Sequence, residues 1–265
     1  MPAPQEAIIE VKNLTVGYGN TTVLQDVSFD VRRGEIFVVL GGSGCGKSTL
    51  VKNMIGLHRP QTGQILYDGL DMVTAEGAQR RSLLRSIGVM YQSGALFGSL
   101  TLMENVRLPL EEFTDLPGPA MDLVAAMKLQ LVGLNGFDQY LPSELSGGMR
   151  KRAAIARAMV LDPQILFLDE PTAGLDPIIS AEMDQLILQL AESLDMTFVI
   201  VTHELPSIFA VADRVIMLDQ RAKGIVASGS PAQLRDTSTD PWVRSFFRRE
   251  TLPVVMQQED RPPHE

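Results

Sequence analysis

The residues best suited to chemistry lie in a glycine-rich stretch that ends in Lys47 and Ser48. Its spacing, Gly-x-x-x-x-Gly-Lys-Ser, is that of a phosphate-binding loop. Glycines let backbone N–H groups turn inward around an oxyanion, and the N-terminus of a following helix adds positive dipole. We expect Lys47 to reach terminal phosphates and the Ser48 hydroxyl to ligate Mg²⁺. The predicted phosphate-binding residues are Gly41, Gly42, Ser43, Gly44, Cys45, Gly46, Lys47, Ser48 and Thr49.

Two acids follow a second apolar stretch. Residues 165–168 read Ile-Leu-Phe-Leu, typical of a buried strand, and Asp169 and Glu170 come directly after them. Ligands bind at the carboxyl ends of strands in open α/β sheets, so we expect both carboxylates at that edge. There Asp169 can hold Mg²⁺, and Glu170 can orient or deprotonate an attacking water. Alone, this pattern fits a structural role equally well. Together with a phosphate loop in the same chain, it indicates a nucleotide-hydrolysing site.

A second anion site is predicted at residues 145–149, Leu-Ser-Gly-Gly-Met, which we name the signature segment. Ser146 is a natural N-cap, and Gly147 and Gly148 expose the first N–H groups of a helix. One nucleotide cannot easily use both loops of one chain. A head-to-tail dimer with twofold symmetry resolves this, because each signature segment would face the phosphates of the other copy. The alternative is an ordinary capped helix. A solvated basic face is expected from Arg150, Lys151, Arg152 and Arg157.

The elements that must position these residues mix strand and helix patterns. Residues 8–31 alternate as strands do, with a turn at 17–20, and residues 93–160 are helix-rich. Prolines at 109, 117, 119 and 142 are expected to interrupt that stretch. Strands are also predicted at 36–40, 63–69, 87–92, 165–168 and 198–201, with a closing hairpin of 215–218 and 224–227. Helices are predicted at 49–55, 79–86, 121–127, 179–194 and 240–247.

The composition is that of an ordinary globular protein, with 265 residues of which 45% are hydrophobic and 21% charged. A formal charge of −9 argues against a nucleic-acid partner bound by bulk electrostatics. Cys45 is the single cysteine, so no intrachain disulfide framework is possible, and we expect it to be a small loop residue rather than a reactive thiol. We find no signal peptide and no apolar run of transmembrane length. The expectation is a soluble, cytoplasmic chain that serves a membrane only through partners.

Over residues 7–230 the order of these motifs resembles the nucleotide-binding subunit of an ATP-binding-cassette (ABC) transporter. The resemblance implies one ATPase domain at 7–247, with ATP and Mg²⁺ as cofactors. It implies an α/β fold with a P-loop NTPase (RecA-like) core, an N-terminal antiparallel β-subdomain and an α-helical subdomain inserted at about 93–160.

The resemblance also implies roles for four further residues. Tyr18 would stack on adenine, and Gln92 would touch Mg²⁺ and the attacking water. Asp176 would lie in a segment that crosses the dimer interface beside the nucleotide, and His203 would hold the γ-phosphate. Without this context, a Tyr in a turn, a lone Gln or a His at a strand end is more often structural. The predicted catalytic set is Glu170, His203, Lys47 and Gln92, and the predicted metal ligands are Ser48, Gln92 and Asp169.

Three short features narrow the resemblance to the ATPases of bacterial Mla/Mce-type lipid transporters. They are Met149, where the common family form has Gln, the small apolar loop 93–97, and residues 240–247, Asp-Pro-Trp-Val-Arg-Ser-Phe-Phe. This implies an ATPase that energises phospholipid trafficking between inner and outer membranes and so maintains outer-membrane lipid asymmetry. The implied partners are a second copy of the chain, integral-membrane permease subunits that contact Gln92–Phe97, and an Mce-domain lipid-binding subunit. The implied location is the cytoplasmic side of the bacterial inner membrane, to which the protein would be peripherally bound.

Two rival functions stay open. One is the ATPase of a small-solute importer, for example for amino acids, and the other is a non-transport ABC remodelling protein. The C-terminal extension, residues 231–265, also has two interpretations. Trp242, Phe246 and Phe247 share one face of the predicted helix, which packs either on the chain's own core or on the neighbouring cassette as a clasp. Residues 257–265 are polar, contain prolines and are expected to be disordered.

Overall fold

Two β-sheets organise the computed structural model of this chain, which describes residues 6–250. The central sheet has the order β10-β9-β3-β8-β7-β6, in which every neighbouring pair is parallel except β10 and β9. The second sheet is antiparallel, with the order β2-β1-β4-β5. The strands are β1 Ala7–Tyr18, β2 Thr21–Arg32, β3 Ile36–Gly41, β4 Thr62–Tyr67, β5 Leu70–Asp71, β6 Ile87–Met90, β7 Ile165–Asp169, β8 Thr197–Val201, β9 Arg214–Asp219 and β10 Gly224–Gly229.

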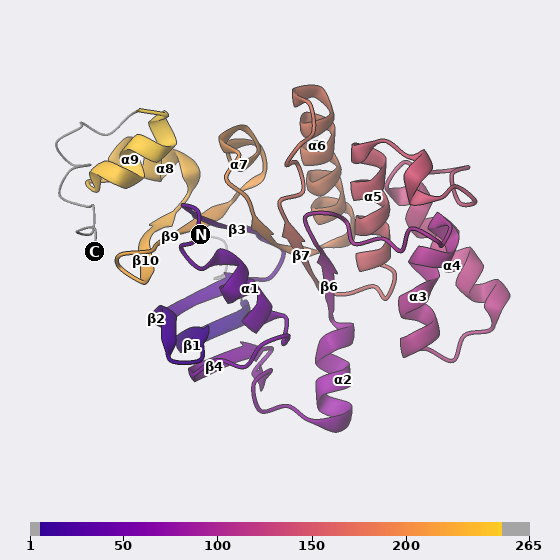
Figure 1. Ribbon diagram of the computed structural model, residues 1–265, viewed down its shortest axis with the longest axis horizontal. Helices are drawn as coiled ribbons and strands as arrows, with labels where there is room; N and C mark the ends of the chain where they lie inside the picture. Colours follow the sequence, from indigo (N-terminus) through magenta and orange to yellow (C-terminus); the bar gives the residue numbers. More distant parts are fainter. Residues whose placement is uncertain (1–5, 251–265) are drawn as a thin grey trace, which may run out of the picture.

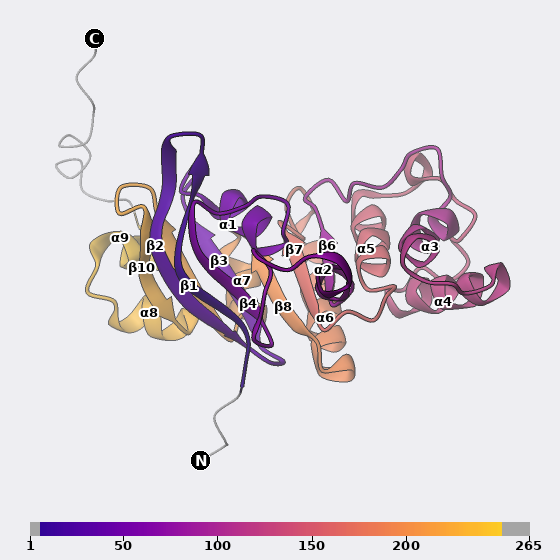
Figure 2. The ribbon, with the colours of Figure 1, turned by 90° about the horizontal axis from the view of Figure 1, so that it is seen from below.

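Helices cover the sheets and extend the molecule at both ends. Figure 1 shows α3, α4 and α5 gathered at one end and α8 and α9 at the other, and Figure 2 shows the same arrangement from below. The helices are α1 Lys47–Met54, α2 Gly77–Arg85, α3 Leu102–Phe113, α4 Gly118–Leu131, α5 Gly147–Ala158, α6 Pro177–Leu194, α7 Leu205–Val211, α8 Pro231–Thr237 and α9 Pro241–Arg248, with a 3₁₀ turn η1 at Pro142–Glu144.

The central strands are apolar on both faces because each face borders a different core. In β3, Phe37 and Val39 pack with α1 and the antiparallel sheet, whereas Val38 and Leu40 pack with α3, α5, α6 and α7. A continuous apolar run is therefore required, and it is what residues 36–40 show. Burial on both faces fixes the position of the carboxyl ends of β3, β7 and β8. The candidate binding and catalytic residues follow these ends.

The predicted strands and helices are found with shifts of a few residues at their ends, and the α/β fold with an antiparallel N-terminal sheet is confirmed. One prediction about the helix-rich stretch was wrong. Pro117, Pro119 and Pro142 do stand at helix starts, but Pro109 lies inside α3. A proline there removes one backbone bond of the helix. Burial of Leu102, Val106 and Leu110 on the same helix offsets that loss.

The C-terminal helix belongs to the core of its own chain. Val243 and Phe247 of α9 are buried in the main hydrophobic cluster, and Phe247 makes an edge contact with Phe209 at 6.1 Å between ring centroids. Packing on the same chain is thus observed, and a clasp onto a neighbouring cassette stays a prediction. Residues 257–265, expected to be disordered, lie outside the described residues. Within residues 6–250, no helix combines the length and hydropathy needed to cross a bilayer.

Candidate active site

The loop between β3 and α1 has a backbone that only glycine accepts easily. Gly41, Gly44 and Gly46 have φ of 148°, 77° and 105°, in the region that side chains avoid. A Cβ on Gly41 would lie 2.5 Å from the Leu218 carbonyl oxygen. No side chain caps the N-terminus of α1, so its first N–H groups face the loop. The backbone forms a cradle suited to an oxyanion. Cys45 is buried in the core beneath it, which fits the prediction of a small loop residue.

Lys47 lies across this cradle. Its Nζ donates to the carbonyl oxygens of Gly41 at 2.7 Å and Gly42 at 2.9 Å. The ammonium group is therefore held at the mouth of the loop, where an anion would bind.

Asp169 and Ser48 line one small cavity beside the loop, together with Lys52 and Tyr91. Burial, reinforced by the neighbouring Glu170 carboxylate, raises the pKa of Asp169, while Lys47 and Lys52 oppose that rise. A hydroxyl and a carboxylate are hard oxygen donors of the kind Mg²⁺ prefers. Among residues 6–250, no group of three or more His, Cys, Asp or Glu side chains is arranged to hold a metal ion by itself.

Glu170 and His203 form a pair at the same edge. The backbone of Glu170 turns sharply after β7, with φ of 51°, and its N–H donates to the Val201 carbonyl at 2.8 Å. Nδ1 of His203 lies 2.6 Å from Glu170 Oε1. Because an ionised carboxylate only accepts, Nδ1 is the donor in this contact when Glu170 is ionised. The second oxygen, Oε2, is buried without a hydrogen-bond partner, so it is free to accept from a water molecule.

The solvated face predicted for the basic residues of α5 is found only in part, because Arg150 is exposed whereas Lys151 is buried. Lys151 is only 7% exposed, and its Nζ donates to the Glu170 carbonyl at 3.0 Å and the Ala173 carbonyl at 2.6 Å. Burial lowers the pKa of Lys151, while the Glu204 and Glu170 carboxylates oppose that change. Arg150 donates to the Leu145 carbonyl, and Arg152 to Glu182 and the Val132 carbonyl. No local sequence pattern identifies Lys151, since its partners lie about twenty residues further along the chain.

A well-held loop follows β6. Buried Asn105 accepts from Phe97 N–H at 2.8 Å, and its Nδ2 donates to the Phe97 carbonyl at 3.0 Å. Arg157 donates to the carbonyls of Gly94 and Ala95 at 2.9 and 2.8 Å. The Phe97 ring is nevertheless 58% exposed. The Gln92–Phe97 loop is therefore fixed in shape while it presents an aromatic ring. Gln92 is exposed two residues beyond β6, at the same sheet edge as Asp169.

Tyr18 lies beside the start of α1. Its Oη is 3.4 Å from Thr49 Oγ1, and the ring makes an edge contact with His58 at 5.8 Å between centroids. The side chain is 51% exposed, which leaves ring surface for another planar group. No sequence motif singles out His58.

The signature segment lies with Asp176 rather than with the phosphate loop. Ser146 caps α5 by accepting from Met149 N–H at 3.2 Å, and a Cβ on Gly148 would lie 2.7 Å from Ile179. Asp176 caps α6 by accepting from Ile178 and Ile179 N–H. Within residues 6–250, no hydrogen bond joins this group to the phosphate loop. One chain therefore assembles the phosphate loop with Asp169, Glu170 and His203 but leaves the signature segment apart.

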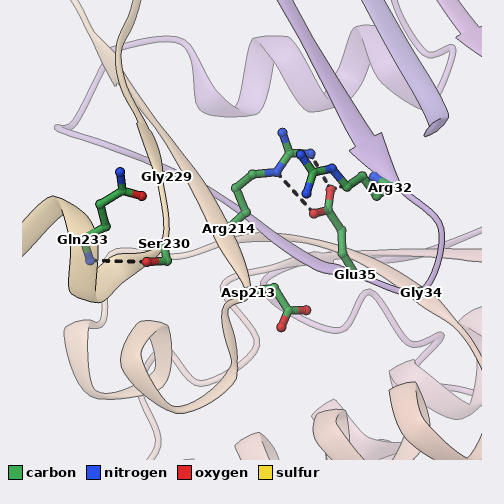
Figure 3. A pocket seen from close by; sticks show the side chains of 8 residues that line it. All are labelled: Arg32, Gly34, Glu35, Asp213, Arg214, Gly229, Ser230 and Gln233. Carbon is green, nitrogen blue, oxygen red and sulfur yellow. Dashed lines mark hydrogen bonds and ion pairs between the residues drawn. The ribbon is translucent and has the colours of Figure 1, made fainter. Parts of the chain in front are cut away.

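A polar pocket near the base of β3 has a structural explanation. Arg214 bridges Asp30 and Glu35, with Nη2 at 3.0 and 2.6 Å from their carboxylate oxygens. Figure 3 shows Arg214 and Glu35 turned toward each other at the wall of the pocket. Asp213 accepts from Ile36 N–H at 2.8 Å. The charges are satisfied by one another, so they tie β9 to the strand that carries the phosphate loop.

Comparison with known proteins agrees with this geometry. The family model described as "ABC transporter" matches residues 24–173. A Mycobacterium leprae protein named "Probable ribonucleotide transport ATP-binding protein mkl" is 43% identical over 97% of this chain and 73% of its own length. An Escherichia coli protein named "Intermembrane phospholipid transport system ATP-binding protein MlaF" is 38% identical over 91% of this chain and 88% of its own.

Solved structures give the same result. The dimeric ATP-binding cassette MJ0796 bound to ADP and Pi superposes with a TM-score of 0.75, at 29% identity over 84% of this chain and 98% of that one. The cbiO1 subunit from Clostridium perfringens, part of the ABC transporter complex cbiONQ, gives 0.80 at 28% identity, over 97% and 100%. The phosphate loop, the acids after β7 and these similarities together show that the chain belongs to the ABC transporter family, as an ATP-hydrolysing subunit.

Proposed function

We propose that this ATPase energises phospholipid movement between the inner and outer membranes of a bacterial cell, and so maintains outer-membrane lipid asymmetry. The observation that carries the coupling to a membrane is the Gln92–Phe97 loop. A fixed loop with an exposed aromatic ring is a suitable docking element, since its backbone is already ordered before a partner binds. The phospholipid cargo is inferred from the similarity to MlaF and from the short sequence features at Met149 and 240–247.

The site residues are assigned roles that fit their positions. The phosphate loop, residues 41–49, holds the phosphates of ATP, and Tyr18 stacks on adenine. Ser48, Asp169 and Gln92 hold Mg²⁺, which when bound neutralises charge on the phosphate oxygens. The Ser48 and Asp169 side chains already line one cavity, which supports this donor set.

Glu170 and His203 carry the hydrolytic step. Glu170 uses Oε2 to orient and deprotonate the attacking water, because Oε1 is engaged by His203. His203 keeps its other ring nitrogen for the γ-phosphate, and its side chain is 62% exposed. Lys47 stabilises the charge that develops on the phosphate.

A second copy of the chain completes each site. The signature segment of one copy, Ser146–Gly148, and Asp176 face the nucleotide held by the phosphate loop of the other. Two observations support this dimer. The two predicted anion sites lie apart within one chain, and the similar cassette MJ0796 is dimeric with ADP and Pi. ATP binds the closed dimer better than the open one, so it shifts that equilibrium, and hydrolysis reverses the shift.

The assembly would sit peripherally on the cytoplasmic side of the inner membrane. Permease subunits would contact Gln92–Phe97, and an Mce-domain subunit would supply the lipid-binding surface. No nucleic-acid partner is expected at a net charge of −9.

Ribonucleotide transport is a second candidate, because the mycobacterial relative is named a probable ribonucleotide transport protein. Purification from native membranes through a tag on this chain, followed by identification of copurifying subunits and lipids, separates the two. Copurified phospholipid with a permease and an Mce-domain subunit is the expected result. The phospholipid proposal would be overturned if a permease copurified without a lipid-binding subunit and the ATPase activity of the complex responded to ribonucleotides or amino acids instead of phospholipid.

A further inference from the structure

Lys151 is a buried cation that the proposed hydrolytic mechanism does not use. Two lysines are buried in the described part of the chain, Lys128 and Lys151. Lys128 forms an ion pair with the Asp162 carboxylate. Lys151 donates instead to two backbone carbonyl oxygens, those of Glu170 at 3.0 Å and Ala173 at 2.6 Å. Because the burial of an ammonium group is costly, this placement indicates that the segment it holds depends on that support.

The two carbonyls belong to the ends of one tight turn. Residues 170–173 read Glu-Pro-Thr-Ala, and Ala173 N–H donates to the Glu170 carbonyl at 3.3 Å, which closes a four-residue β-turn. Lys151 therefore bridges the first and the last residue of the turn with a single ammonium group. Hydrogen bonds from a charged donor are stronger than those between neutral groups, so this bridge adds to the weaker bond within the turn.

The backbone at the start of this turn adopts a conformation that needs support. Glu170 has φ of 51°, in the left-handed region that residues with a Cβ rarely adopt. It also precedes Pro171, and a proline restricts the backbone of the residue before it. Such a conformation persists where surrounding contacts determine it. The N–H of Glu170 donates to the Val201 carbonyl, and Lys151 holds the carbonyl on the other side of the same residue.

The backbone of Glu170 sets the position of its carboxylate. Oε1 lies 2.6 Å from His203 Nδ1, and Oε2 is buried without a hydrogen-bond partner. Backbone dihedrals fix the direction in which a side chain leaves the main chain, so a relaxed turn would move both oxygens. A misplacement of about 1 Å can cost about 10²-fold in rate. The bonds of Lys151 go to the backbone, so any effect it has on the reaction is exerted through Glu170.

We propose that Lys151 is a positioning residue of the ATPase site. Its ammonium group holds the turn 170–173 and so keeps the Glu170 carboxylate where it can orient and deprotonate water. The inference rests on the proposed role of Glu170 and adds a residue that the mechanism does not include. The alternative is that Lys151 only stabilises the packing of α5, and the two roles predict different patterns of loss.

The first measurement separates turnover from nucleotide binding in the full chain. Lys151→Met keeps the length of the side chain and removes its donors. The kcat for ATP hydrolysis should fall about 10²-fold, as for a misplaced catalytic group, while the affinity for ADP stays within about twofold of wild type. Unchanged kcat, or equal losses of kcat and ADP affinity, would overturn the proposal.

Arg152→Met is the matched control for this measurement. It makes the same change at the next residue of α5, whose partners are the Glu182 carboxylate and the Val132 carbonyl rather than the turn. Its kcat should stay within about twofold of wild type. A loss as large as that of Lys151→Met would assign the effect to the packing of α5 and contradict a specific role of Lys151.

A double-mutant cycle tests whether Lys151 acts through Glu170. If it does, the single-turnover rate of Lys151→Met combined with Glu170→Gln equals that of Glu170→Gln within about twofold, because the carboxylate to be positioned is already absent. Independent losses would multiply, making the double variant about 10²-fold slower, and that result would reject the positioning role. ATP-bound dimers should still form in the double variant. Their absence would assign Lys151 to the dimer contact and count against the proposal as well.

Two further points keep the test decisive. Lys151→Gln takes the place of Lys151→Met in the same cycle if the latter does not fold, because it removes the charge and retains a polar group. Normal turnover by Glu170→Gln would overturn the role of Glu170 and, with it, that of Lys151. Multiplied losses on top of an inactive Glu170→Gln would overturn the role of Lys151 alone.

Discussion

Nδ1 of His203 lies 2.6 Å from Oε1 of Glu170, so the two residues share one hydrogen bond and leave Glu170 Oε2 as the only free oxygen of the carboxylate. The two carboxylate oxygens therefore have different roles: Oε1 orients the His203 ring, and Oε2 is left to bind water. The shared bond also makes His203 dependent on Glu170 for its ring orientation.

Replacing Glu170 by Gln should abolish turnover and keep ATP binding. Gln fills the same volume and can still accept from His203, but it cannot take a proton from water. We expect kcat to fall by about 10² to 10⁴, the usual contribution of general base catalysis. ATP-bound dimers should accumulate, detectable by size-exclusion chromatography. Turnover at the wild-type rate would remove Glu170 from the mechanism.

Lys151→Met should lower both stability and ATPase activity. The change removes the ammonium donor of the Glu170 and Ala173 carbonyls. The Glu170 carbonyl still accepts from Ala173 N–H at 3.3 Å, so the expected cost is about 1–3 kcal/mol for the Ala173 carbonyl. The melting temperature and kcat of the variant measure this. Arg152→Ala is the control, because it lies next on the same helix but forms an exposed ion pair with Glu182, worth about 0–1 kcal/mol. Equal losses in the two variants would contradict the positioning role of Lys151.

Local patterns in the sequence predict much of this molecule. The strand before Gly41, the helix after Gly46 and the acids after residue 168 are local signals, and each is found where it was expected. The burial of Lys151 could not be predicted from local sequence patterns. A basic run on a helix resembles a solvated face, and only the distant turn at 170–173 makes this lysine a buried donor.

Asn105 and Pro109 were missed for related reasons. Asn105 lies inside a helix, where asparagine is unfavourable unless its side chain forms hydrogen bonds with other groups. Its position four residues after the capping residue Thr101 was therefore a sign of such a bond in the sequence. Pro109 was expected to break the helix, and tertiary packing of α3 overrides that local rule. Asp176 was expected near the nucleotide, and within one chain the structure gives it a capping role, so its contact with ATP depends on a second copy.

Asn105→Ala should uncouple the membrane partner from the ATPase site. It removes the bonds that fix the Phe97 backbone and that join Leu100 and Thr101 to the same side chain. The loop becomes mobile, so a partner must order it on binding. We expect the isolated chain to hydrolyse ATP within about twofold of wild type and the reconstituted complex to lose most of its lipid transport.

Phe97→Ala is the companion variant for this prediction. It keeps the Asn105 bonds and removes only the exposed ring. Transport should fall in this variant too, with no change in melting temperature. Normal transport in both variants would show that the Gln92–Phe97 loop does not dock the partner.

Trp242 should report nucleotide binding. It is the only tryptophan of the chain, and a Cβ on Gly42 would lie 4.0 Å from its Cζ2 atom, so the indole borders the phosphate loop. Buried Val243 and Phe247 anchor α9, which keeps the ring in that place. Addition of ATP or ADP should change the intensity or the wavelength of tryptophan emission, because the environment of the indole gains a charged phosphate. Lys47→Ala should abolish the change through loss of binding, and Trp242→Phe should bind nucleotide without a signal. Emission that stays constant while a separate assay shows saturation would mean that α9 does not sense the phosphate loop.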